Sequence, residues 1–285
     1  NQDLEKMLDT SDQWITTRTG ISFRRIASCE EAASDLGVEA AKKALADAKM
    51  EAKDVELIIA ASASPDMIFP STACIIQGKL GAKNAAAFDV QAACSGFVYA
   101  LAVADQFIVS GMYKNILVVG TEVLSKVVDW EDRNTCVLFG DGAGAVVVSE
   151  VDQGGILASV LGADGRGADL LSLPAGGSRE PASFETVSNR RHYIKMNGSE
   201  VFKFAVKILE QSTRDVVSKA NLSLEDITFL IPHQANYRII DAAIKRLELE
   251  KDKSIINLNY YGNMSSASIP VALDEAYRAG KFKKG

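Results

Sequence analysis

The sequence predicts an α/β protein whose sheets are covered by helices on both faces. Segments with helical periodicity alternate with short apolar runs along most of the 285 residues. The runs are continuously apolar, as in VELIIAA (55–61) and NILVVG (115–120). Strands that are half exposed alternate polar and apolar residues instead, so these runs are typical of strands buried on both faces.

A repeat within the chain predicts that the fold is duplicated. DVELII (54–59) resembles DITFLI (226–231), a shift of 226 − 54 = 172 residues. The same shift relates Tyr99-Ala-Leu101 to Val271-Ala-Leu273. One offset at both ends of a strand–helix–strand–helix unit indicates an internal duplication, although short apolar words can also coincide by chance.

The expected elements of the first half carry recognisable start and stop signals. Thr10-x-x-Gln13 is typical of a capping box before a short helix that contains Trp14. Further helices are expected at 34–48, at 71–80 between Ser71 and Gly81, and at 95–110 before Gly111. The strands expected between them are 55–61, 86–90 and 115–120.

The middle of the chain differs, and helix–strand alternation then resumes. Residues 135–150 and 155–161 have the composition of strands with no helix between them, so we expect them to join the sheet as antiparallel strands. Residues 175–192 are predicted to form an exposed loop. The remaining expected elements are helices at 199–220, 236–247 and 266–279 and strands at 227–231 and 255–258. We place the boundary between an N-terminal half, 1–162, and a C-terminal half, 163–285.

Composition excludes several classes of protein. With 31 Lys and Arg against 37 Asp and Glu, the net charge is −6, which disfavours general nucleic-acid binding. No run of 18 apolar residues is present, so no membrane-spanning helix is expected. The four cysteines are scattered without a Cys-x-x-Cys pair and there are two histidines, so neither a disulfide scaffold nor a metal site is expected. A reducing cytoplasm fits this cysteine content best.

Cys94 is the candidate nucleophile. It lies between the strand ending near Val90 and the long apolar helix, in Ala-Ala-Cys-Ser-Gly. A thiol at a helix start is expected to have a lowered pKa, and the small neighbours permit a tight turn and close approach of a substrate. The alternative, a buried cysteine that packs as a small hydrophobe, suits Cys74 and Cys136 better, because both lie within apolar runs.

His233 and Asn263 are the candidate polar partners of Cys94. His233 directly follows an expected buried strand, where α/β folds place their sites, whereas His192 lies in the polar loop. Asn263 also lies between a strand and a helix, and the repeat places it three residues from the counterpart of Cys94, residue 266. A plain Gly-Asn turn would explain Asn263 equally well on its own.

The glycine-rich run Phe139-Gly-Asp-Gly-Ala-Gly-Ala145 does not indicate a nucleotide-binding loop. Such a loop requires a helix after the glycines, and here the sequence continues as a strand. We interpret these glycines as positions where the backbone packs closely beneath the site.

Four motifs together resemble the β-ketoacyl-[acyl-carrier-protein] synthase III family, and the resemblance extends over the whole chain. The motifs are DVQAACSGF (89–97), FGDGAGA (139–145), PHQAN (232–236) and YGNMSSAS (261–268). The resemblance implies the thiolase-like fold, a duplicated α-β-α-β-α arrangement of five layers, which agrees with the repeat. It also implies a condensing enzyme that starts bacterial type II fatty-acid synthesis.

The resemblance assigns a role to each catalytic residue. Cys94 would take the acyl group from acyl-CoA, and malonyl-acyl carrier protein would then decarboxylate and condense with it to give a 3-oxoacyl product. His233 and Asn263 would donate hydrogen bonds to the malonyl thioester oxygen, and the Cys94 backbone N–H to the first tetrahedral intermediate. Coenzyme A thioester is substrate in this scheme, and neither a cofactor nor a metal is expected.

The resemblance also assigns binding residues. Trp14 and Arg133 match positions that sandwich the adenine of coenzyme A, and Arg18 and Asn236 match further coenzyme A contacts. Phe69 matches a residue that reaches across a homodimer and limits the partner's acyl pocket; the preferred starter chain is left open. The basic residues expected to dock the acidic acyl carrier protein share one helix after His233, namely Arg238, Lys245 and Arg246.

One departure from the family and three alternatives accompany this interpretation. The family has a strand before the position of Asn1 and a strand pair after that of Gly285, so a chain ending at these points is expected to be destabilised. Thiolases carry a second catalytic cysteine in the C-terminal half, and no cysteine follows Cys136. The order Cys94, His233, Asn263 also matches papain-like peptidases, and an inactive scaffold is the alternative without catalysis.

Overall fold

A four-stranded sheet forms the centre of the first half. The computed structural model describes residues 1–283. The strands lie in the order β2-β1-β3-β4; β1 is parallel to β2 and β3, and β4 is antiparallel to β3, as predicted. Their bounds are β1 Leu57–Ala61, β2 Ala86–Val90, β3 Asn115–Val123 and β4 Asp141–Ser149.

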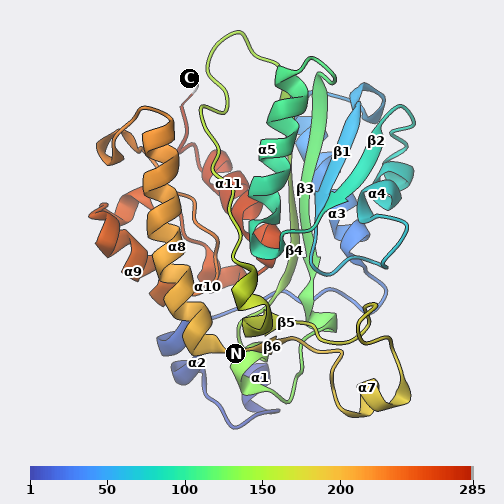
Figure 1. Ribbon diagram of the computed structural model, residues 1–285, viewed down its shortest axis with the longest axis vertical. Helices are drawn as coiled ribbons and strands as arrows, with labels where there is room; N and C mark the ends of the chain where they lie inside the picture. Colours follow the sequence, from blue (N-terminus) through green and yellow to red (C-terminus); the bar gives the residue numbers. More distant parts are fainter. Residues whose placement is uncertain (284–285) are drawn as a thin grey trace.

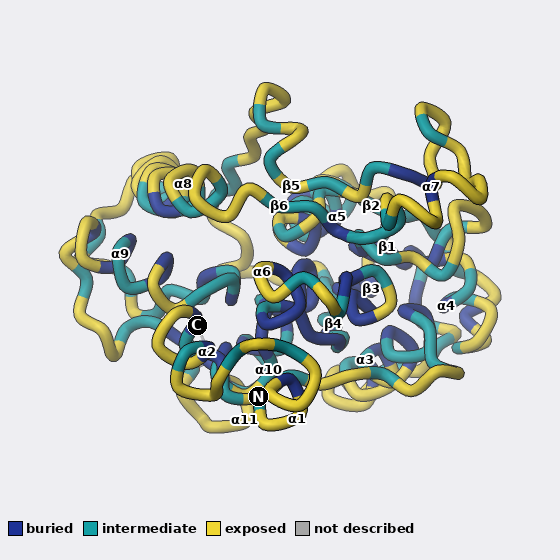
Figure 2. Tube along the Cα trace, turned by 90° about the horizontal axis from the view of Figure 1, so that it is seen from below, coloured by how far each residue is buried: buried dark blue, intermediate teal, exposed yellow. Residues whose placement is uncertain are grey.

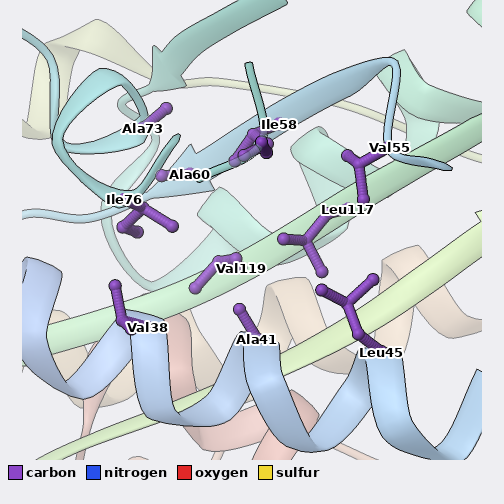
Figure 3. Packing of buried hydrophobic residues seen from close by; sticks show 11 residues of the cluster. Val38, Ala41, Leu45, Val55, Ile58, Ala60, Ala73, Ile76, Leu117 and Val119 are labelled. Atoms are coloured by element: carbon purple, nitrogen blue, oxygen red, sulfur yellow. The ribbon is translucent and has the colours of Figure 1, made fainter. Parts of the chain in front are cut away.

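One face of this sheet packs against α3 (Ala33–Ala48) and α4 (Thr72–Leu80). Alternate residues of a strand point to opposite faces, so Leu117 and Val119 of β3 lie on this side. Figure 3 shows them against Val38, Ala41 and Leu45 of α3. The amphipathic periodicity predicted for 34–48 is therefore the face that α3 buries.

The other face packs against α5 (Gly96–Val109) and, along β4, against α11 (Ser268–Arg278). Ile116 and Val118 of β3 contact this layer together with the fully buried Phe97. In Figure 1, α5 and α11 lie next to each other, and in Figure 2 the buried strand β3 lies between the layers of α5 and α3. Helices α5 and α11 therefore both begin inside the molecule, next to the turns that carry the candidate site.

The second half supplies the helices gathered beyond α11 (Figure 1). These are α8 (Gly198–Lys219), α9 (Tyr237–Leu247) and α10 (Leu258–Tyr261). The shorter remaining elements are α1 Gln2–Glu5, α2 Asp12–Thr19, α6 Arg133–Cys136, α7 Phe184–Ser188, β5 Leu171–Ser172 and β6 Lys195–Met196. Within residues 1–283, no helix is long and apolar enough to cross a bilayer.

Local geometry repeats at the offset found in the sequence. The 3-10 helices η2 (Ala93–Ser95) and η7 (Ser265–Ala267) occupy equivalent positions, and each leads directly into α5 or α11. Their first residues share an unusual left-handed conformation, with φ of 44° at Ala93 and 45° at Ser265. The duplication therefore includes the turns that carry the candidate site residues, while the boundary at residue 162 stays a prediction.

Several predicted elements are wrong in detail. Residues 155–161 are mostly exposed and form no strand, and none of the sheets described within residues 1–283 includes them. The predicted strands 227–231 and 255–258 are reduced to one parallel bridge between Leu230 and Ser254, and Leu258 begins α10 instead. Ser11, rather than Thr10, caps α2 by accepting a hydrogen bond from the Trp14 N–H at 3.1 Å. The loop 175–192 is largely exposed as predicted but contains α7.

Candidate active site

Cys94 lies in η2, in the turn between the carboxyl end of β2 and the start of α5. The strained conformation of Ala93 turns the chain sharply at this point, as the small residues around Cys94 predicted. The side chain is partly buried, and η2 packs against η7, the equivalent turn of the second half. The Cys94 thiol is therefore presented between the two turns that the repeat relates.

The expectation that the helix start lowers the pKa of Cys94 is wrong. Burial raises the pKa of this thiol to about 11, and the nearby Glu122 adds to the increase, while the Ser265 hydroxyl acts in the opposite direction. Cys94 is consequently a protonated thiol at neutral pH, and it must lose its proton when it attacks a substrate.

Two backbone hydrogen bonds and one side-chain hydrogen bond hold Asn263 in place. Its N–H donates to the Leu138 carbonyl at 2.8 Å, and its carbonyl accepts from the Gly140 N–H at 3.0 Å. The side-chain Oδ1 accepts from the Ser265 N–H at 2.9 Å, which leaves the Nδ2 group to donate elsewhere. An amide held in this way can donate to a substrate oxygen without titrating.

His233 is a buried imidazole without a protein partner. Neither Nδ1 nor Nε2 has a hydrogen-bond partner within residues 1–283, although both atoms are shielded from solvent. Burial lowers the pKa of His233 to about 4, so the ring is neutral at physiological pH. A neutral imidazole has one N–H donor and one acceptor, and buried polar atoms normally find partners. The ring is thus available to a ligand.

The glycines of the FGDGAGA run lie beneath these residues, as predicted. A Cβ on Gly142 would lie 2.5 Å from the Met264 sulfur, and one on Gly144 would lie 2.8 Å from Cβ of Pro270. Both glycines are in β4, so the run is a strand and not a phosphate loop. Their lack of side chains allows the turn after Asn263 to approach the sheet.

Trp14 is enclosed by two guanidinium groups. The Arg133 and Arg18 guanidinium carbons lie 4.9 and 5.3 Å from the ring centroid. The structure thus brings together three of the four residues predicted to bind coenzyme A. The fourth, Asn236, caps α9 by accepting from the Arg238 N–H at 2.9 Å and donates through Nδ2 to the Arg18 carbonyl at 3.2 Å.

The three basic residues on α9 differ in their surroundings. Lys245 pairs with Asp241 at 2.6 Å, and Arg246 lies 3.6 Å from Glu210. Within residues 1–283, no carboxylate lies within 4.0 Å of Arg238, whose guanidinium is 5.8 Å from the Phe202 ring centroid. Of these three basic residues on α9, Arg238 is therefore the one whose charge no nearby carboxylate in the described part of the chain neutralises.

Phe69 lies on the opposite edge of the molecule, in an exposed loop between β1 and α4. Its side chain is 82% exposed, and its neighbours Met67 and Ile68 are 49% and 78% exposed. Three consecutive apolar side chains are therefore exposed in this loop.

Sequence reasoning missed Glu122 of β3, which is fully buried behind the site. Its carboxyl accepts from the backbone N–H groups of Ala63, Ser64 and Ser266 at 3.0 to 3.2 Å, and it also bonds to the Ser266 hydroxyl at 2.8 Å. It therefore ties the loop after β1 to η7. Burial raises the pKa of Glu122. The sequence feature that could have identified Glu122 is that it is a single acidic residue within an apolar strand.

The remaining cysteines and possible metal ligands can also be placed. Cys136 is buried as expected, but Cys74 is exposed, so the prediction that it packs in the core is wrong. Within residues 1–283, no group of three or more His, Cys, Asp or Glu side chains could hold a metal ion.

A cysteine at a strand-to-helix turn, an unpartnered neutral histidine and an oriented asparagine define a thiol-dependent acyltransferase of the condensing-enzyme class. The family models of 3-oxoacyl-[acyl-carrier-protein] synthase III and of its C-terminal part match residues 88–165 and 217–285. The chain belongs to the β-ketoacyl-[acyl-carrier-protein] synthase III family, the condensing enzymes that initiate fatty-acid synthesis.

Relatives and solved structures agree with this assignment. The chain is 62% identical to the β-ketoacyl-[acyl-carrier-protein] synthase III of Caldanaerobacter subterraneus, covering 100% of the chain and 86% of the relative. It is 57% identical to that of Clostridioides difficile, covering 100% and 87%. The crystal structure of the Aquifex aeolicus synthase III matches with a TM-score of 0.92 at 50% identity, covering 100% of this chain and 88% of that one. The thiolase-like fold is thereby confirmed.

Proposed function

We propose that this chain condenses an acyl group from acyl-CoA with malonyl-acyl carrier protein, using Cys94, His233 and Asn263. The observation that carries the proposal is the pair of shielded nitrogens of His233, which have no partner within residues 1–283, together with the fixed side-chain amide of Asn263. Donors that are already oriented and have no protein acceptor are suited to a negative charge that develops on a substrate oxygen.

The proposed reaction has two steps. The Cys94 sulfur attacks the acyl-CoA carbonyl, coenzyme A leaves as its thiol, and the thiol proton of Cys94 passes to that leaving group. Malonyl-acyl carrier protein then loses carbon dioxide, and the resulting enolate attacks the acyl-enzyme. The carbon–sulfur bond to Cys94 breaks, the departing thiolate takes a proton from water, and a 3-oxoacyl-acyl carrier protein is released. His233 and Asn263 stabilise the enolate oxygen in the second step.

The test is an assay that follows the two steps separately. Acetyl-CoA should add one acetyl group to the protein, and peptide mapping should place it on Cys94. Malonyl-acyl carrier protein should then remove this group and release carbon dioxide in equal amount. An acetyl group on any other residue, or a stable adduct that malonyl-acyl carrier protein does not discharge, would overturn the proposal.

Trp14, Arg18, Arg133 and Asn236 are proposed to hold coenzyme A. The close approach of both guanidinium groups to the indole supports adenine stacking here, since each provides a flat cationic face. Trp14→Ala should raise KM for acetyl-CoA about tenfold and leave kcat nearly unchanged, since the contact is remote from the reacting atoms. Steady-state kinetics with acetyl-CoA, and with an acetyl thioester that lacks the nucleotide, would separate these effects.

Arg238 is proposed to be the main docking residue for acyl carrier protein on α9. Arg238→Gln should raise KM for malonyl-acyl carrier protein roughly tenfold, whereas Lys245→Gln should have a smaller effect because Asp241 already neutralises that charge. Added salt should reproduce the effect in the wild-type protein. Malonyl-CoA lacks the acidic protein partner, so an equal loss with malonyl-CoA would mean that Arg238 shapes the active site instead.

A homodimer is also proposed. Strand β2 is the outermost strand of its sheet, and such an edge presents unpaired backbone groups to a partner. The exposed apolar loop around Phe69 provides the contact surface. Sedimentation equilibrium measures this directly, and a mass near 30.6 kDa, that of one chain, would contradict it. The proposed location is the cytoplasm, which the four free cysteines support.

A further inference from the structure

Gln234 is a fully buried amide directly after His233. Its side chain is 0% exposed and forms four hydrogen bonds, all to backbone groups. The Nε2 group donates to the carbonyls of Pro232 at 2.8 Å and Ile255 at 3.2 Å. The Oε1 atom accepts from the N–H groups of Asn257 at 3.1 Å and Leu258 at 3.2 Å. Every hydrogen-bonding position of this amide is therefore used.

The two acceptor bonds place the start of α10. Helix N-termini have N–H groups without partners inside the helix, and the N-cap residue usually satisfies one of them. Here Asn257 is the N-cap of α10 but makes no side-chain cap bond. Its Nδ2 donates instead to Glu275 at 2.8 Å. The cap of α10 is thus supplied from another segment of the chain by Gln234.

The two donor bonds fix the segment that carries His233. The bond from Nε2 to Pro232 closes a tight turn with His233 at its tip. The His233 ring has no hydrogen bond of its own within residues 1–283, so the path of this turn determines where the ring lies. The bond to Ile255 attaches the turn to the segment that leads into α10.

A short rigid path connects this amide to Asn263. Helix α10 spans Leu258–Tyr261 and ends at Gly262. The φ of this residue is 71°, a value that glycine adopts readily and other residues adopt with strain. Asn263 follows directly. The His233 turn and the Asn263 turn, which α9 and α10 separate along the chain, are therefore joined through one side chain.

We propose that Gln234 is a positioning residue that sets the distance between the His233 and Asn263 donors. This proposal rests on the proposed function, in which both donors bind the same enolate oxygen. A displacement of a catalytic group by about 1 Å can reduce a rate on the order of 10²-fold, so a single amide linking both donors controls decarboxylation. Its hydrogen bonds within residues 1–283 all go to residue 232 and the segment 255–258 and none reaches Cys94, so acylation of Cys94 should not depend on it.

Gln234→Glu tests the proposal because it replaces the amide group that donates to Pro232 and Ile255 by a carboxyl oxygen. Whether that oxygen carries a proton to donate then depends on the pH. An ionised carboxylate keeps the two acceptor bonds, but it faces the carbonyls of Pro232 and Ile255 without a proton to donate. A protonated carboxyl restores one donor. The other ionisable groups that this network reaches are Glu275, through Asn257, and the neighbouring His233.

The expected result is a loss of decarboxylation and condensation of about 10²-fold in Gln234→Glu at pH 8, mostly in kcat, with progressive recovery as the pH falls. Acylation of Cys94 by acetyl-CoA should stay within about twofold of the wild type. Gln234→Met, similar in size but unable to form these bonds, should show the same loss without recovery at low pH. Gln77→Glu is the matched control, since Gln77 donates at 2.8 Å to the Ala82 carbonyl at the end of α4, remote from the site.

Three outcomes would overturn the proposal. The first is condensation by both Gln234 variants within twofold of the wild type at all pH values. The second is an equal loss of acylation and decarboxylation with a lowered melting temperature, which would indicate a purely structural amide. The third is a loss in Gln234→Glu that does not change with pH. Failure of the wild-type protein to form an acyl-enzyme would instead refute the proposed function.

Discussion

Replacing Cys94 by serine should abolish acyl transfer. A serine hydroxyl has no base bonded to it in this position and is a poor nucleophile at its ordinary pKa. Loss of a nucleophile typically lowers kcat by on the order of 10⁴-fold or more, so the expected activity is near the background of the assay. Incubation with acetyl-CoA followed by intact-mass measurement should show one acetyl group on the wild type and none on Cys94→Ser.

Cys74→Ser is the matched control for this experiment. Cys74 is also a free cysteine at the start of a helix, but it is exposed on α4. The control should acylate and condense like the wild type. Full condensing activity in Cys94→Ser, or loss of the acetyl group in Cys74→Ser instead, would remove Cys94 from the mechanism.

Alanine at His233 or Asn263 should stop decarboxylation more completely than acylation. Removal of one oxyanion donor typically costs about 10²–10³-fold in kcat, and the two donors are proposed to act on one oxygen. Release of labelled carbon dioxide from malonyl-acyl carrier protein measures this step. Acylation of Cys94 should stay measurable in both variants, because both side chains are proposed to act on the enolate oxygen of the second step.

The pH dependence provides a second check on His233. Because burial lowers the pKa of His233 to about 4, the neutral ring persists as the pH falls from 8 to 5. Decarboxylation should therefore show no titration near pH 6.5, the ordinary value for histidine. His192→Ala and Asn189→Ala, both in the loop 175–192, are the controls and should retain full activity. Complete loss of acylation in both site variants would contradict the proposed division of labour.

The sequence was sufficient for the parts of the fold that apolar runs and helix signals specify locally. Strands β1, β2 and β3 and helices α3, α4 and α5 form within a few residues of the predicted bounds. The antiparallel strand β4 was also predicted, but the predicted run 135–150 began too early, because Arg133–Cys136 form α6 and the strand starts at Asp141. Cys94 and His233 were predicted from their places at the ends of such elements, and Asn263 from the repeat and the family resemblance; their catalytic roles stay predictions.

The errors occur where distant residues determine local structure. Residues 255–258 have strand composition, but the Gln234 amide occupies the Ile255 carbonyl and the Asn257 and Leu258 N–H groups that a strand ladder would need. The pKa of Cys94 was predicted in the wrong direction because burial depends on how η2 and η7 pack, which no local motif specifies. Glu122 was missed for the same reason, since its partners come from two remote turns.

The enclosure of Trp14 by Arg18 and Arg133 has a consequence for turnover. In the proposed binding mode the adenine enters between the indole and a guanidinium that already lies over the ring, so one stacking contact opens before another forms. In this proposal the stacking gain is partly offset by the contact that has to open, and retention of coenzyme A also depends on contacts with the rest of the molecule. In the proposed two-step cycle, spent coenzyme A must depart before the second thioester can approach Cys94. The arginine contacts with the Trp14 ring would re-form as coenzyme A leaves, and in this proposal they favour its release between the two half-reactions.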